Sequence, residues 1–256
     1  MAFLIIAFKN KITYRNQVLF AIIGSVIEIY IKIALWMYLY RNDAAMTEYM
    51  IMYTVLSNII SMFYINSITN KIGDRIINGY IAVDLLRPVH FLYSSYMQCI
   101  GEMCADLLLR GVPVLVFFGA YLWKYSERIV YQQMAAALAA VILGHILYMQ
   151  IFMTIGLMAM ILMETWAIHR IMNDIILFLS GAFIPLSLFP DMLYRINLFL
   201  PFRFLFSFPL ELLLNETDNG VILGNFGVLC GWIVLLGGMI WGMNHRMMRK
   251  LVIQGG

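Results

Sequence analysis

Charged residues are scarce in this sequence. Asp, Glu, Lys and Arg make up only 12% of its 256 residues, against the roughly 25% that is typical of soluble domains. Hydrophobic residues make up 63%, and the mean hydropathy is +0.85. The shortage of charge excludes an ordinary soluble fold and predicts an all-α integral membrane protein. At about 20 residues per span, residues 1–256 have room for one transmembrane domain of about six helices.

Other absences limit the chemistry. The three cysteines, Cys99, Cys104 and Cys230, lie in apolar surroundings without paired spacing, which argues against a disulfide framework or a zinc site. No two histidines have metal-ligand spacing, and no Gly-x4-Gly-Lys-Ser/Thr loop is present to bind ATP. The net charge of +3 is spread along the chain without a basic stripe for nucleic acid. The sequence therefore predicts no catalytic residue, no metal site and no cofactor bound by this chain.

The N-terminal segment MAFLIIAFKNKITYRNQ differs from a signal peptide, because its charges follow the apolar run instead of preceding it. We expect an uncleaved amphipathic helix at the cytoplasmic membrane interface. Its expected apolar residues are Phe3, Leu4, Ile5, Phe8 and Ile12.

Six apolar segments are expected to cross the bilayer. They cover residues 17–40, 49–68, 98–123, 132–158, 174–190 and 221–243. The apolar region 91–123 is longer than a bilayer core, so its first turns are expected to project into the cytoplasm or lie along the interface.

The segment 70–90, NKIGDRIINGYIAVDLLRPVH, is too polar to span a membrane. Ile72, Ile76, Ile77 and Tyr80 recur at helical spacing, and Pro88 ends the pattern. The spacing predicts an amphipathic helix on the inner membrane face.

Residues 180–210 are apolar, but they cannot form one continuous helix. They contain Gly181 and four prolines, Pro185, Pro190, Pro201 and Pro209, and proline removes a helix hydrogen bond and clashes with the preceding turn. Broken backbone at membrane depth is tolerated only where protein or a water-filled cavity shields it. Two interpretations follow: a re-entrant hairpin on the outer side, or a kinked spanning helix followed by a loop.

The distribution of Lys and Arg predicts the orientation. With the N-terminus inside, ten basic residues fall in inner segments: Lys9, Lys11, Arg15, Lys71, Arg75, Arg87, Arg170, Arg246, Arg249 and Lys250. Five fall in outer segments: Arg41, Lys124, Arg128, Arg195 and Arg203. Because inner loops carry the excess of positive charge, both termini are expected to be cytoplasmic.

Apart from Asp174 at the start of the fifth span, five charged residues lie within the expected spans, where each costs about 2.5 to 3.5 kcal/mol on insertion scales. Glu28 and Lys32 are four residues apart, as are Asp106 and Arg110, so each pair can form an ion pair on one helix face. Glu102 has no such neighbour. These residues either satisfy each other inside the bundle or line a polar pathway.

Two segments resemble motifs of one transporter family. The segment GDRIINGYIAVDLLRPV is similar to a signature of ABC-2 type exporter permeases, in the subfamily of viologen-exporter-like and drug or peptide export permeases. The segments SGAFIPLSLFP and LPFRFLFSFPLEL are similar to a second motif of that subfamily. The order of elements along the whole chain also resembles these permeases.

The resemblance implies a division of labour between subunits. Separate ATP-binding subunits would bind ATP and Mg²⁺ and dock on the inner face, and two permease chains, identical or related, would form the pathway through a bacterial plasma membrane. The implied coupling residues are Asp74, Arg75, Gly79, Asp84, Arg87 and Pro88. The implied gate of the re-entrant hairpin comprises Gly181, Pro185, Pro190, Pro201, Phe202 and Pro209.

Export of a hydrophobic, amphipathic or cationic substrate (a drug, peptide or lipid-like molecule) is the function that the resemblance implies. The alternative is an autonomous secondary transporter or channel, in which Glu28, Lys32, Glu102 and Asp106 carry protons or ions. An intramembrane enzyme is a third possibility, but no cluster of acid, base and nucleophile supports it.

Overall fold

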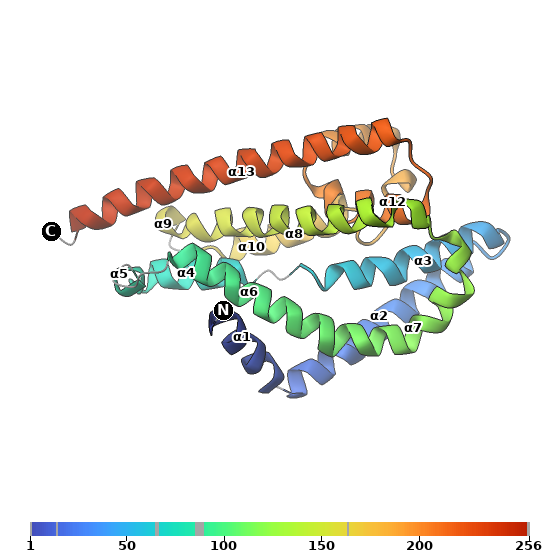
Figure 1. Cartoon of the computed structure of the whole chain (residues 1–256), viewed down its shortest axis with the longest axis horizontal. Helices are drawn as coiled ribbons and strands as arrows, with labels where there is room; N and C mark the ends of the chain where they lie inside the picture. The colour runs from blue at the N-terminus through green and yellow to red at the C-terminus, as the bar shows by residue number, and fades with distance from the viewer. Residues whose placement is uncertain (1, 14, 65–66, 85–89, 163, 255–256) are drawn as a thin grey trace.

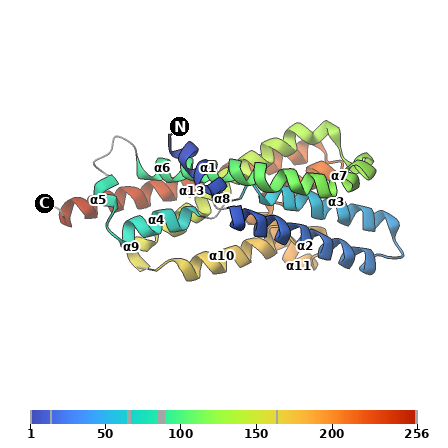
Figure 2. The ribbon, with the colours of Figure 1, turned by 90° about the horizontal axis from the view of Figure 1, so that it is seen from below.

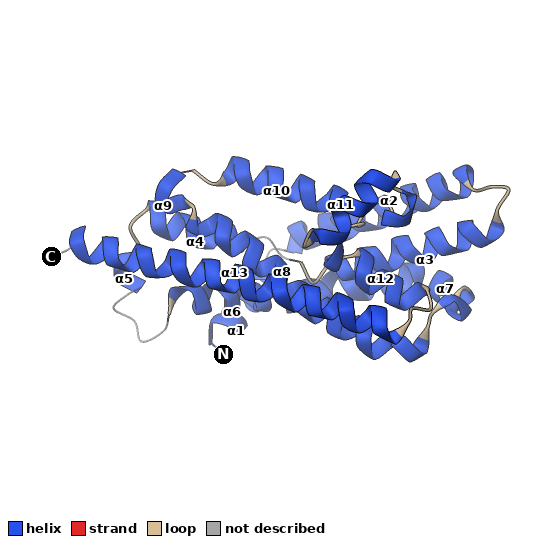
Figure 3. Ribbon diagram, turned by 90° about the horizontal axis from the view of Figure 1, so that it is seen from above, coloured by secondary structure: helices blue, strands red, loops and turns tan. Residues whose placement is uncertain are grey.

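The fold is a bundle of helices elongated along one axis (Figure 1). The computed structural model describes residues 2–13, 15–64, 67–84, 90–162 and 164–254, and every regular element in these ranges is helical (Figure 3). The predicted all-α class is confirmed for this part of the chain. Arg87 and Pro88, two of the expected coupling residues, lie outside the described residues.

The helices follow one another with short connections. The first half of the chain forms α1 (Ala2–Thr13), α2 (Arg15–Leu39), α3 (Ala44–Ser61), α4 (Ile68–Ile77), α5 (Ile81–Asp84), α6 (Phe91–Asp106), the π-helical turn η1 (Leu107–Gly111), α7 (Val112–Lys124) and η2 (Ser126–Arg128). The second half forms η3 (Tyr131–Gln133), α8 (Met134–Leu157), α9 (Ala159–Leu162), α10 (Trp166–Leu179), η4 (Leu186–Leu188), α11 (Asp191–Phe199), η5 (Phe202–Phe204), α12 (Ser207–Leu214) and α13 (Asn219–Gln254).

Four helical segments among the described residues are long and apolar enough to cross a membrane. They are Asn16–Leu39, Phe91–Lys124, Tyr131–Leu162 and Asn219–Met248. These segments correspond to the first, third, fourth and sixth expected spans.

The second and fifth expected spans differ from their predictions. Helix α3 ends at Ser61 instead of continuing to residue 68. Helix α10 has 14 residues, about 21 Å at 1.5 Å per residue, which is shorter than a bilayer core. The fifth expected span, 174–190, overlaps a helix only in its first part, because α10 runs from Trp166 to Leu179 and the chain then leaves the helix, with Gly181 at a φ of +82°.

Helix α8 lies at the centre of the bundle. In the most apolar stretch of the crossing segment that contains α8, 61% is buried inside the structure. The corresponding stretches of α2 and α13 are only 17% and 11% buried. Helix α8 packs against α13, α4 and α12. The outward faces of α2 and α13 are apolar, as expected for surfaces that contact lipid or another membrane chain.

The segment expected to form one amphipathic helix over 70–90 is divided into α4 and α5. The buried residues of α4 include Ile68 and Ile72, and the helix packs against α8, α6 and α9 (Figure 2). The prediction of a single helix is wrong because Gly79 has a φ of +70°, the left-handed conformation that ends many helices.

Helix α1 is fixed against α6 at two points. A Cβ atom at Gly101 would lie 2.3 Å from the carbonyl oxygen of Leu4, so the two backbones meet at a position that only glycine permits. The ammonium of Lys11 lies 3.0 Å from Asp106 Oδ1. Ile5 and Ile12, by contrast, are 47% and 40% exposed, which leaves apolar surface on the outside of this helix.

We expect Gly101→Ala to lower the melting temperature of the purified protein, because the new methyl group would displace α1. Overpacking costs about 1 to 3 kcal/mol, which corresponds to a few °C in thermal unfolding. The control is Gly119→Ala on α7, where a Cβ would meet no atom within 4 Å. Equal melting temperatures for the two variants would contradict the close packing of α1 on α6.

Candidate functional site

The proline-broken segment consists of short helices that begin at its prolines. Pro185, Pro190 and Pro201 immediately precede η4, α11 and η5, and Pro209 lies in the first turn of α12. This is the position that proline tolerates, since the first N–H groups of a helix have no intrahelical partner. The expected breaks at these prolines are confirmed. Phe202, the other expected gate residue, is partly buried against the main hydrophobic core.

Side chains of other segments bind the backbone that the breaks leave open. The hydroxyl groups of Tyr53 and Ser57 on α3 donate to the carbonyl oxygens of Gly181 and Ala182 at 2.5 and 2.8 Å. The hydroxyl of Tyr64 donates to the carbonyl oxygen of Leu205 at 2.5 Å. These bonds give partners to backbone carbonyl groups that lie outside the regular helices.

Gly181 is required at the first break. Its positive φ is a conformation that side chains rarely adopt, and a Cβ there would lie 2.9 Å from the Tyr53 hydroxyl. The backbone N–H of Ser207 donates to the carbonyl oxygen of Ser180 at 2.9 Å, which ties the start of α12 to the end of α10.

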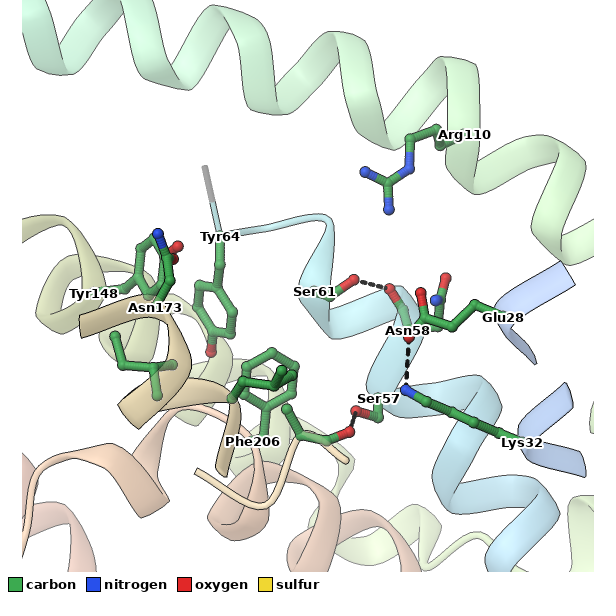
Figure 4. Close-up of a pocket in the computed structure, with 13 residues that line it drawn as sticks. Glu28, Lys32, Ser57, Asn58, Ser61, Tyr64, Arg110, Tyr148, Asn173 and Phe206 are labelled. Carbon is green, nitrogen blue, oxygen red and sulfur yellow. Dashed lines mark hydrogen bonds and ion pairs between the residues drawn. The ribbon is translucent and has the colours of Figure 1, made fainter. Parts of the chain in front are cut away.

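A polar cavity of about 230 Å³ adjoins this break (Figure 4). It is lined by Glu28 and Lys32 of α2, by Ser57, Asn58, Ser61 and Tyr64 of α3 and the residues after it, by Arg110 of η1, by Tyr148 of α8, by Asn173, Ile176 and Leu177 of α10, and by Ala182 and Phe206. Three of the five charged residues predicted within spans therefore meet around one cavity. The hydroxyl and amide residues of α3 were missed in the sequence, although Ser57 and Ser61 are four apart and lie on one face of an apolar helix.

The predicted pair of Glu28 and Lys32 is present. Lys32 Nζ lies 2.6 Å from Glu28 Oε1, and the Lys32 side chain is 14% exposed against 53% for Glu28. The Lys32 ammonium also lies 4.9 Å from the ring centroid of Phe183, a cation–π distance.

Asp106 forms ion pairs with Lys11 and with its predicted partner Arg110. Asp106 lies 3.0 Å from the Lys11 ammonium and 3.4 Å from Arg110 Nη1, so its closer partner comes from α1. Arg110 belongs to the π-helical turn η1, which ends at Gly111, two residues before Pro113. Because proline removes a helix hydrogen bond, the wider turn is the local adjustment. The result is that Arg110 faces the cavity with only a weak ion pair behind it.

Glu102 has partners in the coupling segment. Its carboxylate lies 2.6 Å from Lys71 Nζ and accepts a hydrogen bond of 2.6 Å from the Ser67 hydroxyl. Sequence spacing could not show this pair, because its members are 31 residues apart. Glu102 and Asp106 do not line the cavity; they attach α4 and α1 to α6.

The remaining expected coupling residues lie on α4 and after it. Asp74 is exposed, and Arg75 Nη1 donates to the Ser94 hydroxyl at 3.2 Å. Gly79 separates α4 from α5, whose last residue is Asp84. Within the described ranges, no three His, Cys, Asp or Glu residues are grouped so that they could hold a metal ion.

The model of a family described as "ABC-2 family transporter protein" matches residues 26–255. No curated protein matches the sequence.

We expect Tyr53→Phe to destabilise the protein, because it leaves the buried carbonyl of Gly181 without this hydrogen bond. An unsatisfied buried acceptor costs about 1 to 3 kcal/mol. The measurement is thermal unfolding in detergent, with Tyr131→Phe as the control because Tyr131 is 62% exposed. If both substitutions had the same small effect, the hydroxyl group would not be what holds the break.

Proposed function

Because the chain belongs to the ABC-2 family of transporter proteins, we propose that it is the membrane permease subunit of an ATP-driven exporter in a bacterial plasma membrane. The observation that carries this proposal is the family match over residues 26–255. ATP and Mg²⁺ are bound by a separate ATP-binding subunit. The substrate is a hydrophobic or amphipathic molecule that leaves the cell.

The proposed topology has six crossings with both termini in the cytoplasm. Helices α3 and α10 are the two short crossings, and the segment from η4 to α12 is a re-entrant hairpin on the outer side. In Figure 1, α4, α5, α9 and the end of α13 lie at one end of the molecule, and the α2–α3 turn and the α12–α13 connection lie at the other. This separation agrees with the excess of Lys and Arg in the inner segments.

Helices α4 and α5 are the proposed docking element for the ATP-binding subunit. The exposed Asp74 lies on α4, and Asp84 ends α5. The ion pair between Lys71 and Glu102 and the packing of α4 on α8 attach this element to two long helices. A displacement of α4 by the ATP-binding subunit would therefore move α6 and α8 with it.

A second permease chain, identical or related, completes the pathway. The large apolar surfaces of α2 and α13 support this proposal, because the most apolar stretches of these two helices are only 17% and 11% buried. Such surfaces contact either lipid or another transmembrane chain.

We expect Asp84→Ala and Arg87→Ala to uncouple ATP hydrolysis from transport while the chain remains inserted in the membrane. Asp84 ends α5 of the proposed docking element, and Arg87 is a coupling residue that the resemblance implies. The loss of either charge is expected to remove a contact to the ATP-binding subunit without disturbing the spans. The measurement is ATP-driven accumulation of a fluorescent amphiphile in inverted membrane vesicles, together with the rate of ATP hydrolysis.

The matched controls are Glu216→Ala and Arg41→Ala, which remove exposed charges in the α12–α13 connection and the α2–α3 turn. Transport and hydrolysis are expected to remain coupled in both controls. Undiminished transport in Asp84→Ala and in Arg87→Ala would refute the coupling role.

A further inference from the structure

The polar cavity beside Gly181 has an excess of positive charge. Lys32 and Arg110 line it, and Glu28 is its only lining carboxylate among the described residues. We infer that this cavity binds one oxyanion group, a phosphate or a carboxylate, at the head of an amphipathic molecule. The inference rests on the proposed function, since it names the class of substrate that the exporter carries.

Arg110 keeps donors available for such a group. Its Nη1 lies 3.4 Å from Asp106, which is closer to Lys11 at 3.0 Å, so the charge of Arg110 is only partly neutralised. Its Nε is buried and has no hydrogen-bond partner in the structure. A buried donor without a partner is costly, and an oxyanion would supply the missing acceptor with the forked geometry that a guanidinium favours.

Lys32 provides the second positive charge. Figure 4 shows Lys32 and Arg110 directed toward the Asn58 region from different sides of the cavity. Lys32 is 14% exposed, whereas its partner Glu28 is 53% exposed and so lies at the edge of the cavity. An oxyanion inside the cavity would contact Lys32 and Arg110 without displacing Glu28 into the interior.

The size and the apolar side of the cavity suit an amphiphile. Its volume of about 230 Å³ is below the roughly 300 to 1,000 Å³ of sites that enclose drug-sized ligands, so it holds a head group and not a whole lipid. Ile176, Leu177 and Phe206 form apolar lining. Leu177 is 52% exposed, which provides a route for an acyl or alkyl chain to leave the cavity along α10.

The test is ligand-dependent thermal stabilisation of the purified full chain in a neutral maltoside detergent. The probes are dodecyl phosphate, dodecanoate, dodecyltrimethylammonium and inorganic phosphate. We expect saturable stabilisation by the two anionic amphiphiles and none by the cationic one. Stronger stabilisation by dodecyltrimethylammonium would overturn the inference, and equal stabilisation by inorganic phosphate would overturn the assignment to an amphiphile.

Two substitutions connect the binding to the cavity. Arg110→Gln and Lys32→Gln are each expected to weaken dodecyl phosphate binding about tenfold, the effect of losing one charge-assisted hydrogen bond. The control Arg41→Gln removes an exposed charge outside the cavity and is expected to leave binding unchanged. Arg110→Lys keeps the positive charge but loses the guanidinium fork and Nε, so its affinity for dodecyl phosphate is expected to lie between those of the unmodified protein and Arg110→Gln. Unchanged binding in both Gln variants would overturn the inference.

This test is independent of the exporter proposal, because it needs no ATP-binding subunit. If an ATP-binding subunit drives transport but anionic amphiphiles do not bind, the cavity assignment is overturned and the exporter stands. If anionic amphiphiles bind and no ATP-binding subunit associates with the chain, the cavity assignment is supported and the exporter is overturned.

Discussion

Hydrogen bonding of the backbone in an apolar environment is the constraint on which the rest of this structure depends. Helices satisfy it internally, but residues 180–206 contain a left-handed glycine and three prolines between short helices. Tyr53, Ser57 and Tyr64 satisfy it there by donating to the carbonyl oxygens of this segment. Ser57 and Tyr64 also line the polar cavity, so α3 and the residues that follow it support both the break and the candidate binding site.

The ion pairs serve a second purpose, which is to attach peripheral helices to the long helix α6–α7. Lys11 joins α1 to Asp106, and Lys71 joins α4 to Glu102. Asp106 and Glu102 are four residues apart and therefore lie on one side of α6. A movement of α4 would be transmitted to the helix that also carries Arg110, which lines the cavity. This continuity gives a physical route from the proposed docking element to the candidate substrate site.

Sequence reasoning located the spans with the strongest hydropathy and the breaks at the prolines, because both depend on local chemistry. The family resemblance also agrees with the family match. The partners of Glu102 and Asp106 could not be predicted, since Lys71 and Lys11 are distant in sequence. The sequence Asn78–Gly79 could have predicted that residues 70–90 form two helices, because helices often end at glycine. The regular spacing of isoleucines favoured one helix instead. The cavity arises from six separate segments and has no signature in any one of them.

The central claim is that this chain works as the membrane subunit of an ATP-driven transporter. The most direct measurement is affinity purification of the tagged chain in mild detergent, with mass spectrometry of the retained proteins and an ATPase assay of the eluate. The account predicts a stoichiometric ATP-binding subunit, ATPase activity in the eluate and a second permease chain, either a copy or a relative. Recovery of this chain alone, without ATPase activity, would contradict the account and favour an autonomous transporter that uses its intramembrane charges.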